Sequence, residues 1–270
     1  MKQKMEPTVL SVVSSTPLSA SYQRVVFRPQ DPARFPPNSA GDYFKLMFSS
    51  QGLPLERAEQ AAEGKLFLRT YTIRHVDPNT HDLTVDFVNH RAESENQTDA
   101  ADLISLASRW ALDARPGDTI LVRGPAPIQG IDTQADFLLY VADMTALPAL
   151  SVKLANLADD AVGLALVQVA DKADIQTLVK PAGIEVRWLA GDATMPLLEQ
   201  AVLALPVPST HSAVWCACEF GQMRTIRRHI TDQWQTSRES RYFSSYWKAG
   251  VTEDGHKILK QQDTVEFNQQ

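Results

Sequence analysis

Residues 137–148 read FLLYVADMTALP. The apolar run, residues 137–142, is followed by Asp143, a short turn and Pro148. The run shows no alternation of apolar and polar residues, which is typical of a strand buried on both faces of a parallel sheet. Pro148 suits the first turn of a helix, because an N–H at that position has no partner within the helix. The stretch therefore predicts a strand, a turn and a helix, the unit from which doubly wound α/β folds are built.

The same alternation of strands and helices continues toward the C-terminus. Further apolar runs lie at residues 162–169, 184–189 and 213–217, and helical patterns lie at residues 147–157, 174–178, 196–205 and 222–234. This order predicts a parallel sheet covered by helices, with ligands at the carboxyl ends of its strands. The residues directly after the first strand, where many nucleotide folds carry a phosphate-binding turn, are Asp143, Thr145, Ala146 and Leu147.

Toward the N-terminus, short segments rich in β-branched and aromatic residues alternate with Pro, Gly, Asp and Asn. They lie at residues 9–13, 21–27, 43–48, 66–75, 83–89 and 119–122, with one helical pattern at residues 102–112. Many short strands with turn signals predict an antiparallel barrel or a sandwich. We therefore expect a β plus α/β chain, with an N-terminal antiparallel β-barrel domain over residues 1–130 and a C-terminal doubly wound parallel-sheet domain over residues 131–270.

Composition excludes several classes of protein. Of the 270 residues, 44% are hydrophobic and 21% are charged, which is typical of a globular chain with a core in each half. The formal net charge of −6 argues against nucleic acid as a partner. With no apolar run of about 18 residues and no export signal, we expect a cytoplasmic monomer without membrane insertion. Cys216 and Cys218 are expected to be reduced and structural, and no spacing typical of a metal site occurs.

The motifs GxGxxG, GxxxxGK[ST], HExxH and GxSxG are all missing, which removes the usual evidence for four common enzyme classes. Residues 69–74, RTYTIR, are more informative. Side chains on a strand alternate between its faces. This divides the segment into Arg69, Tyr71 and Ile73 on one face and Thr70, Thr72 and Arg74 on the other. Tyrosine can stack on a planar ring and arginine can hold phosphate, so the segment suits a flavin; an edge strand with surface arginines is the alternative.

Seven blocks follow one another along the chain: RTYTIR, DFVNH, SRWA, PGD with a following GP, DMTALPAL, WCACEFGQMRTIRRHI and YWKAG. This succession, over roughly residues 8–250, resembles the siderophore-interacting protein family of flavin-dependent ferric-siderophore reductases, within the ferredoxin-reductase-like superfamily. The resemblance implies that the barrel domain binds FAD and that the α/β domain is of the NAD(P)H-binding kind. It also implies that iron is released by reduction, because Fe(II) gains less than Fe(III) from hard anionic ligands.

The resemblance further implies roles for individual residues. The FAD-binding set is Arg69, Thr70, Tyr71, Thr72, Arg74, Asp86, Val88, His90, Ser108, Arg109, Trp110, Tyr246 and Trp247. The nucleotide-binding set is Asp143, Thr145, Ala146, Leu147 and Glu219. Lys45, Arg241 and Lys248 are expected to attract an anionic ferric siderophore, with solvated surface cations as the alternative. No catalytic acid, base or nucleophile is expected, because the cofactor carries the chemistry.

Two features depart from the pattern of the family. An acidic stretch, residues 91–105, is inserted before the SRWA block, and Cys218 stands where glycine is usual. A bulkier residue at that position would crowd a nicotinamide nucleotide, so NADH, NADPH and reduced ferredoxin all stay open as electron donors. A general NAD(P)H:flavin or ferredoxin-type reductase and a flavin-bearing siderophore-binding protein with little turnover are the alternative functions.

Overall fold

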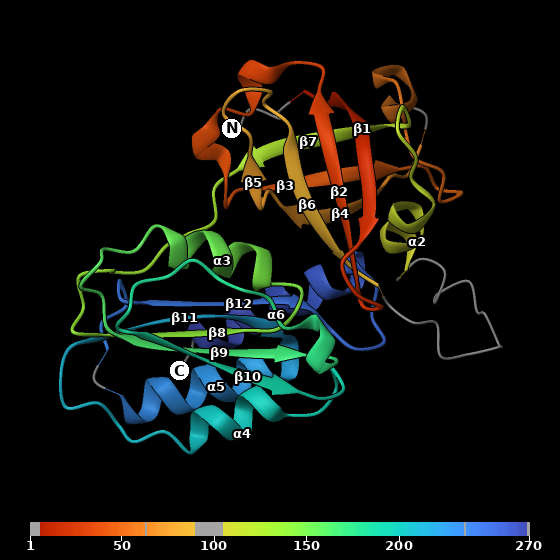
Figure 1. Ribbon diagram of the computed structural model, residues 1–270. Coiled ribbons are helices and arrows are strands. Elements are labelled where there is room, and N and C mark those ends of the chain that lie inside the picture. The colour runs from red at the N-terminus through yellow and green to blue at the C-terminus, as the bar shows by residue number, and fades with distance from the viewer. Residues whose placement is uncertain (1–5, 63, 90–104, 235, 269–270) are drawn as a thin grey trace. The chain divides into compact units, whose positions relative to one another are not determined.

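The computed structural model describes residues 6–62, 64–89, 105–234 and 236–268 (Figure 1). The chain divides into two compact units. Unit 1 comprises Met1–Ile128 together with Thr252–Gly255, and unit 2 comprises Gln129–Val251 together with His256–Gln270. The predicted boundary after residue 130 lies close to this division. The short segment Thr252–Gly255, in contrast, belongs to unit 1, whereas the predicted division placed it in the C-terminal domain.

Unit 1 is built on a seven-stranded antiparallel sheet with the strand order β4-β3-β7-β1-β2-β6-β5. The strands are β1 (Thr8–Pro17), β2 (Tyr22–Pro29), β3 (Tyr43–Phe48), β4 (Phe67–Thr72), β5 (His75–Val76), β6 (Leu83–Val88) and β7 (Thr119–Ala126). β4 and β5 stand at the two ends of the sheet, yet only Ile73 and Arg74 separate them in the chain, so the sheet must curl until its ends meet. Among the described residues no ladder joins β4 to β5, so the predicted barrel is curved but open at this seam.

The inner face of the curled sheet holds the core of unit 1. Alternate residues of the strands point inward, such as Val25 and Phe27 on β2 and Val85 and Phe87 on β6, and all four are fully buried. The remaining elements of the unit are α2 (Leu106–Asp113) and the 3₁₀ helices η1 (Pro32–Arg34), η2 (Pro37–Ser39) and η3 (Ala58–Ala62). Helix α2 adds Leu106 and other apolar side chains to the same core.

Unit 2 is built on a five-stranded parallel sheet with the strand order β10-β9-β8-β11-β12. The strands are β8 (Phe137–Ala142), β9 (Gly163–Val169), β10 (Ile184–Ala190), β11 (Ser212–Glu219) and β12 (Arg241–Trp247). The helices are α3 (Leu147–Ala155), η4 (Lys172–Asp174), α4 (Leu197–Leu203), α5 (Phe220–Gln233) and α6 (Glu253–Asn268). Figure 1 shows α3 on one side of the sheet and α4 and α5 on the other, which confirms the predicted doubly wound arrangement.

The helix predicted over residues 174–178 is wrong. Only η4 forms there, and its turn is closed by the side chains of Asp171 and Asp174. Of the apolar residues in this range, Ile175 is 44% exposed and Leu178 is half-buried. Because Ile175 faces solvent, a helix at this position would gain little stability from packing of an apolar face.

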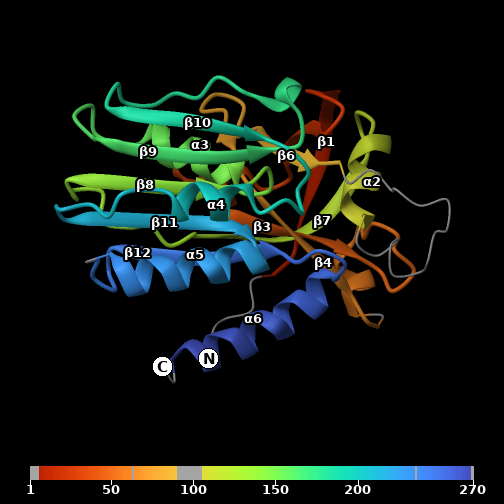
Figure 2. The same ribbon diagram turned by 90° about the horizontal axis from the view of Figure 1, so that it is seen from below.

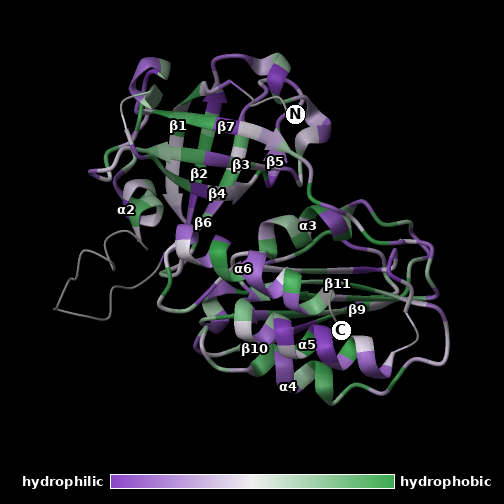
Figure 3. Ribbon diagram, turned by 180° about the vertical axis from the view of Figure 1, so that it is seen from behind, coloured by the Kyte–Doolittle hydropathy of each residue, from purple (hydrophilic) through white to green (hydrophobic). Residues whose placement is uncertain are grey.

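Strand β12 and helix α6 were not predicted from the pattern of apolar residues. The apolar side chains Ile258 and Val265 of α6 are exposed, and polar contacts hold the helix instead. Arg227 of α5 donates to both carboxylate oxygens of Asp263, each at 2.7 Å. Lys260 donates to the hydroxyl of Ser244 on β12 at 2.6 Å. Figure 2 shows α6 alongside α5, and Figure 3 shows hydrophilic stretches on both helices.

Among the described residues, no helix combines the length and the apolar character needed to cross a bilayer.

Candidate functional site

An aromatic cluster in unit 1 gathers one ring from each of β2, β4, β6 and α2. The Tyr71 ring lies 4.2 Å from that of Phe87, and the Trp110 ring lies 6.3 Å from Phe87 and 5.9 Å from Phe27, nearly parallel to it. Tyr71 and Trp110 are only partly buried against the core. Burial raises the pKa of Tyr71 above its ordinary value, which keeps the phenol protonated. Rings of this kind can stack on a planar ligand.

Two arginines share one buried carboxylate at the residue before Phe87. Asp86 accepts from Arg24 Nε and Nη2 at 2.7 and 2.9 Å, and from Arg74 Nη1 at 2.8 Å, while its own side chain has no exposed surface. Arg24 stands directly opposite Asp86 in the β2–β6 register, and Arg74 is fixed by its N–H, which donates to the carbonyl of Thr84. The hydrogen bond with Asp86 raises the pKa of Arg24.

The Arg24–Asp86–Arg74 group suits a phosphate. Two guanidinium groups against one carboxylate leave one net positive charge, and Asp86 takes only some of the five N–H donors that each arginine carries. The aromatic cluster offers a ring surface and this group offers cationic donors, the two kinds of contact that FAD requires. Alternation along β2 and β6 places the aromatic rings on the inner face of the sheet and Arg24 and Asp86 on its outer face. Arg24 was not predicted as a site residue, because only the pairing of β2 with β6 brings it next to Asp86.

The other residues of the predicted flavin segment lie on both faces of β4, as the alternation of the strand predicts. Arg69 is opposite Leu46, is 5% exposed and donates to the carbonyl of Leu68 at 2.9 Å. Thr70 is exposed on the opposite face and is the cross-strand partner of Lys45. Thr72 ends β4 and is buried. Thr70 is thus grouped with the predicted substrate lysine rather than with Tyr71.

The role of the predicted pyrophosphate segment in binding FAD stays a prediction. Ser108 is buried, and its hydroxyl donates to the carbonyl of Ser105 at 2.9 Å, so its proton is used inside α2. Arg109 has an exposed side chain, and Val88 is half-buried at the end of β6. His90 lies outside the described residues.

In unit 2, the strands β8, β11 and β12 are adjacent and parallel, which brings the residues that follow them to one edge. Asp143 accepts from the backbone N–H of Thr145 at 2.9 Å and also from its hydroxyl, and its second oxygen accepts from Trp247 Nε1 at 2.7 Å. The carbonyl of Asp143 accepts from the N–H groups of Ala146 and Leu147 at 3.1 and 3.0 Å. Burial raises the pKa of Asp143 above its ordinary value.

These contacts change the interpretation of the turn after β8. The three amide donors at residues 145–147 all bind Asp143, and Pro148 has no N–H, so none of these four residues offers a backbone N–H to a phosphate. The predicted residues do come together, but as a turn closed by its own carboxylate. Any nucleotide phosphates bound by unit 2 require other donors.

Glu219 and Lys248 also meet at this edge. Glu219 caps α5, where one of its oxygens accepts from the N–H groups of Gly221 and Gln222. Its other oxygen accepts from Lys248 Nζ at 3.4 Å, and the Lys248 ammonium lies 5.8 Å from the ring centre of Phe220. The neighbouring Tyr246 is largely buried, which raises its pKa well above the ordinary value.

Arg241 does not belong to the same group as Lys248. It starts β12, whereas Lys248 follows the end of that strand, so a strand rise of about 3.3 Å per residue separates them by roughly 20 Å. The guanidinium of Arg241 donates to the carbonyl of Ser237 at 3.1 Å and to the hydroxyl of Thr231 at 3.2 Å. The two cations therefore lie at opposite ends of β12, and a substrate role for either one stays a prediction.

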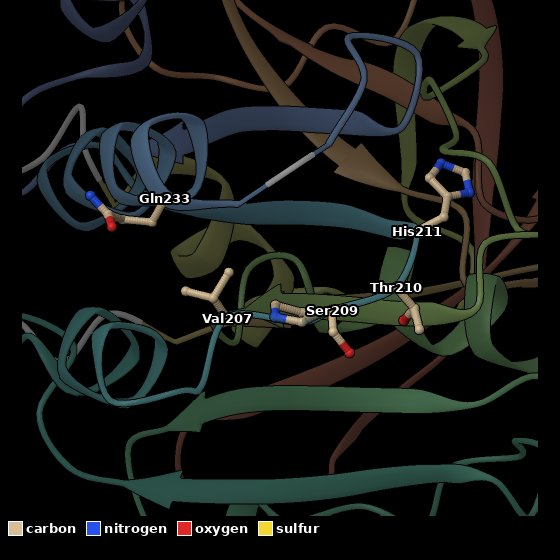
Figure 4. Close-up of a pocket in the computed structure, with 6 residues that line it drawn as sticks. Val207, Ser209, Thr210, His211 and Gln233 are labelled. Carbon is tan, nitrogen blue, oxygen red and sulfur yellow. The ribbon is translucent and has the colours of Figure 1, made fainter.

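A polar cavity of about 380 Å³ lies at the amino edge of the sheet in unit 2 (Figure 4). It is lined by Val207, Pro208, Ser209, Thr210, His211 and Gln233. His211 stands just before β11, and its ring nitrogen Nε2 is 3.1 Å from Ser240 Oγ. None of the predicted site residues lines this cavity. Apart from Arg241, the predicted site residues of unit 2 lie at the opposite, carboxyl edge of the sheet.

The two cysteines lie on β11, face the core and are fully buried as free thiols with their sulfur atoms 3.9 Å apart. The hydrogen bond with Cys216, together with burial, raises the pKa of Cys218 well above its usual value. A thiol that stays protonated and inaccessible is a poor nucleophile, so neither sulfur is suited to reaction in the folded protein.

Replacing Asp143 by asparagine is expected to destabilise unit 2 by about 1–3 kcal/mol at low pH, because one amide donor then faces either Trp247 or Thr145 without an acceptor. The raised pKa of Asp143 means that the wild-type protein loses stability as the pH rises above about 4, whereas asparagine does not titrate. The advantage of the wild type should therefore shrink with rising pH. Urea denaturation at about pH 4 and about pH 7 measures both effects. The exposed Asp160→Asn is the control, and a pH-independent difference for Asp143→Asn would contradict the assignment.

Comparisons with known proteins extend over both units. Residues 11–128 match the sequence model described as "Siderophore-interacting FAD-binding domain", and residues 135–250 match the one described as "Siderophore-interacting protein". The ferric vibriobactin reductase of Vibrio cholerae is 25% identical over 265 residues, which cover 94% of each chain. The NADPH-dependent ferric-chelate reductase of Escherichia coli is 28% identical over 255 residues, which cover 89% of this chain and 92% of its own.

Solved structures agree with the sequence comparisons. The siderophore-interacting protein SipS from Aeromonas hydrophila is similar with a TM-score of 0.81 and 26% identity, covering 97% of this chain and 99% of its own. A siderophore utilization protein from T. fusca has a TM-score of 0.75 at 28% identity, covering 94% of this chain and 97% of its own. The FAD/NAD-binding domain of a nitric oxide dioxygenase from Vibrio cholerae has a TM-score of 0.61 at 13% identity, covering 91% of this chain and all of its own. This likeness shows a shared fold.

Proposed function

Because the chain belongs to the siderophore-interacting protein family, we propose that it is an FAD-dependent reductase that releases iron from ferric siderophores. The observation that carries the proposal is that the unit matching the FAD-binding domain contains both two partly buried aromatic residues, Tyr71 and Trp110, and the charged Arg24–Asp86–Arg74 group. The names of two relatives, a ferric vibriobactin reductase and a ferric-chelate reductase, support reduction rather than binding alone.

Different side chains of unit 1 would make different contacts with the cofactor. Tyr71 and Trp110 offer ring surface, and their packing on Phe87 fixes where that surface lies. Arg74 and Arg24 offer charged N–H donors, and Asp86 orients both guanidinium groups. When bound, FAD supplies the electron transfer that converts Fe(III) to Fe(II). Because Fe(II) is held more weakly by hard oxygen ligands, reduction is the step that releases the metal.

The protein itself contributes placement and charge rather than proton transfer. Lys45 and Lys248, two cations of the predicted substrate group, each have about a third of the side chain exposed (34%). Such charges attract an anionic ferric chelate even though the net charge of the chain is −6. An electron can pass without covalent contact between protein and chelate, so no catalytic acid, base or nucleophile is required.

The proposed electron donor is NADH, NADPH or reduced ferredoxin. The name of the Escherichia coli relative favours NADPH, whereas residues 145–148 of the turn after β8 offer no backbone N–H to nucleotide phosphates. Each of these donors is a cytoplasmic reductant, and we propose that the protein acts there as a monomer.

An anaerobic reduction experiment tests the proposal. The purified protein is expected to be yellow from bound FAD, and its oxidised-flavin absorbance should bleach on addition of NADH, NADPH or reduced ferredoxin. Addition of a ferric siderophore should then restore the absorbance while a ferrous-specific chelator develops colour. A colourless protein that takes up no FAD would overturn the flavin assignment. A flavin that bleaches but yields no Fe(II) would leave a flavin-bearing siderophore-binding protein in its place.

A further inference from the structure

Lys45 and Thr70 face each other across β3 and β4 on the side of the sheet away from the core. They are direct partners in the antiparallel register, and Lys45 Nζ donates to Thr70 Oγ1 at 2.6 Å. Strand β4 is an end strand of the sheet, so its outward N–H groups have no further strand to bind. Thr70 therefore offers a hydroxyl and a backbone N–H close to the Lys45 ammonium.

A carboxylate of the chain itself occupies these donors. Glu253, in the segment Thr252–Gly255 that belongs to unit 1, accepts from Thr70 N–H through Oε2 at 3.0 Å. Its Oε1 accepts from Thr70 Oγ1 at 2.6 Å and from Lys45 Nζ at 3.1 Å. Both oxygens are thus bound, one by an amide and the other by a hydroxyl and an ammonium. This is the geometry of a bound carboxylate rather than of a simple ion pair.

We propose that Lys45 and Thr70 form a subsite for a carboxylate of the ferric chelate, and that Glu253 fills this subsite in the free protein as an internal competitor. The proposal rests on the proposed function, since it specifies which substrate group Lys45 meets. A chelate carboxylate presents the same two oxygens as Glu253 and can replace it on the same three donors. The side chains of Lys45 and Glu253 are 34% and 28% exposed, so a dissolved chelate can reach them.

The strength of the contact indicates that Glu253 tunes affinity rather than closing the site. A partly exposed ion pair contributes about 1 kcal/mol or less, which corresponds to about fivefold in an equilibrium constant. A chelate that carries several negative charges overcomes this competition, whereas a neutral or cationic chelate gains nothing by displacing Glu253. The contact therefore favours anionic, carboxylate-bearing chelates.

Binding of redox-inactive gallium(III) complexes to the full-length protein tests the subsite without any turnover. Calorimetric titration with gallium(III) citrate should show Glu253→Gln binding about threefold to fivefold more tightly than the wild type, because an amide no longer neutralises Lys45. Lys45→Met should weaken binding of the same complex. Gallium(III) desferrioxamine B, which is cationic, should bind Glu253→Gln no more tightly than it binds the wild type. Glu266→Gln is the matched control, because it makes the same charge change on α6 at a side chain paired with Arg224.

The decisive comparison is the double variant Lys45→Met/Glu253→Gln. If Glu253 acts by occupying Lys45 and Thr70, its removal should give little further gain once Lys45 is gone. An equal gain in both backgrounds, or the same gain from Glu266→Gln, would reduce the effect to overall charge and overturn the proposal. Absence of gallium citrate binding in every variant would also overturn it. Failure of the proposed function is seen separately, as absence of Fe(II) in the anaerobic experiment with wild-type protein.

Discussion

Asp86→Ala should lower the free energy of unfolding of unit 1 by about 3 kcal/mol, because it leaves Arg24 and Arg74 facing each other without the carboxylate between them. The side chain of Asp86 has no exposed surface, and those of Arg24 and Arg74 are 31% and 14% exposed, so water compensates little for the loss. Urea denaturation followed by circular dichroism measures the change. The variant should also retain less FAD after gel filtration, because the two guanidinium groups lose their orientation.

The chain offers a matched control for this experiment. Arg28 donates to Asp82 through two hydrogen bonds of 2.8 and 2.7 Å, the same fork that Arg24 makes with Asp86. The Arg28 side chain, however, is 58% exposed, so solvent replaces the lost partner in Asp82→Ala. A loss for Asp82→Ala as large as that for Asp86→Ala would show that burial of the Arg24–Asp86–Arg74 group is not what makes it important.

Arg74→Ala should raise the dissociation constant of FAD by about tenfold to a hundredfold, since a hydrogen bond to a charged group contributes about 1.5–3 kcal/mol. Asp86 keeps Arg24 as a partner in this variant, so the fold should persist, and the thermal transition of the apoprotein checks that it does. Titration of the apoprotein with FAD, followed by the quenching of flavin fluorescence, gives the constant directly. Arg28→Ala is the control with unchanged affinity. Equal affinities for Arg74→Ala and the wild type would remove Arg74 from the cofactor site.

The order of the two architectures could be predicted from the sequence because the local spacing of apolar residues differs between antiparallel strands and buried parallel strands. The strand β8 was predicted with its observed bounds, Phe137–Ala142, since a strand covered on both faces must be apolar at nearly every position. Helix α6 carries no such signal. Its contacts are ion pairs and hydrogen bonds such as Arg227 with Asp263, and the apolar Ile258 and Val265 point to solvent.

The candidate site was predicted in its residue types more fully than in its contacts. Tyr71, Arg74 and Asp86 were expected near a flavin, and the structure brings Arg74 and Asp86 into direct contact. Asp143 and Glu219 were expected to face a nucleotide, which stays a prediction, and the structure shows that each carboxylate binds backbone amides of its own chain. A carboxylate next to free N–H groups satisfies them whether or not a ligand is present, and a residue list cannot distinguish these outcomes.

By itself, the sequence determined that a β-rich half precedes an α/β half, because burial of one or both faces of a strand sets the pattern of apolar residues along it. Only the tertiary structure decided which charges meet. Arg24 reaches Asp86 across 62 residues, and Lys45 reaches Glu253 across 208. Such pairs depend on strand register and on the packing of distant segments, which fix side-chain positions to within a hydrogen bond.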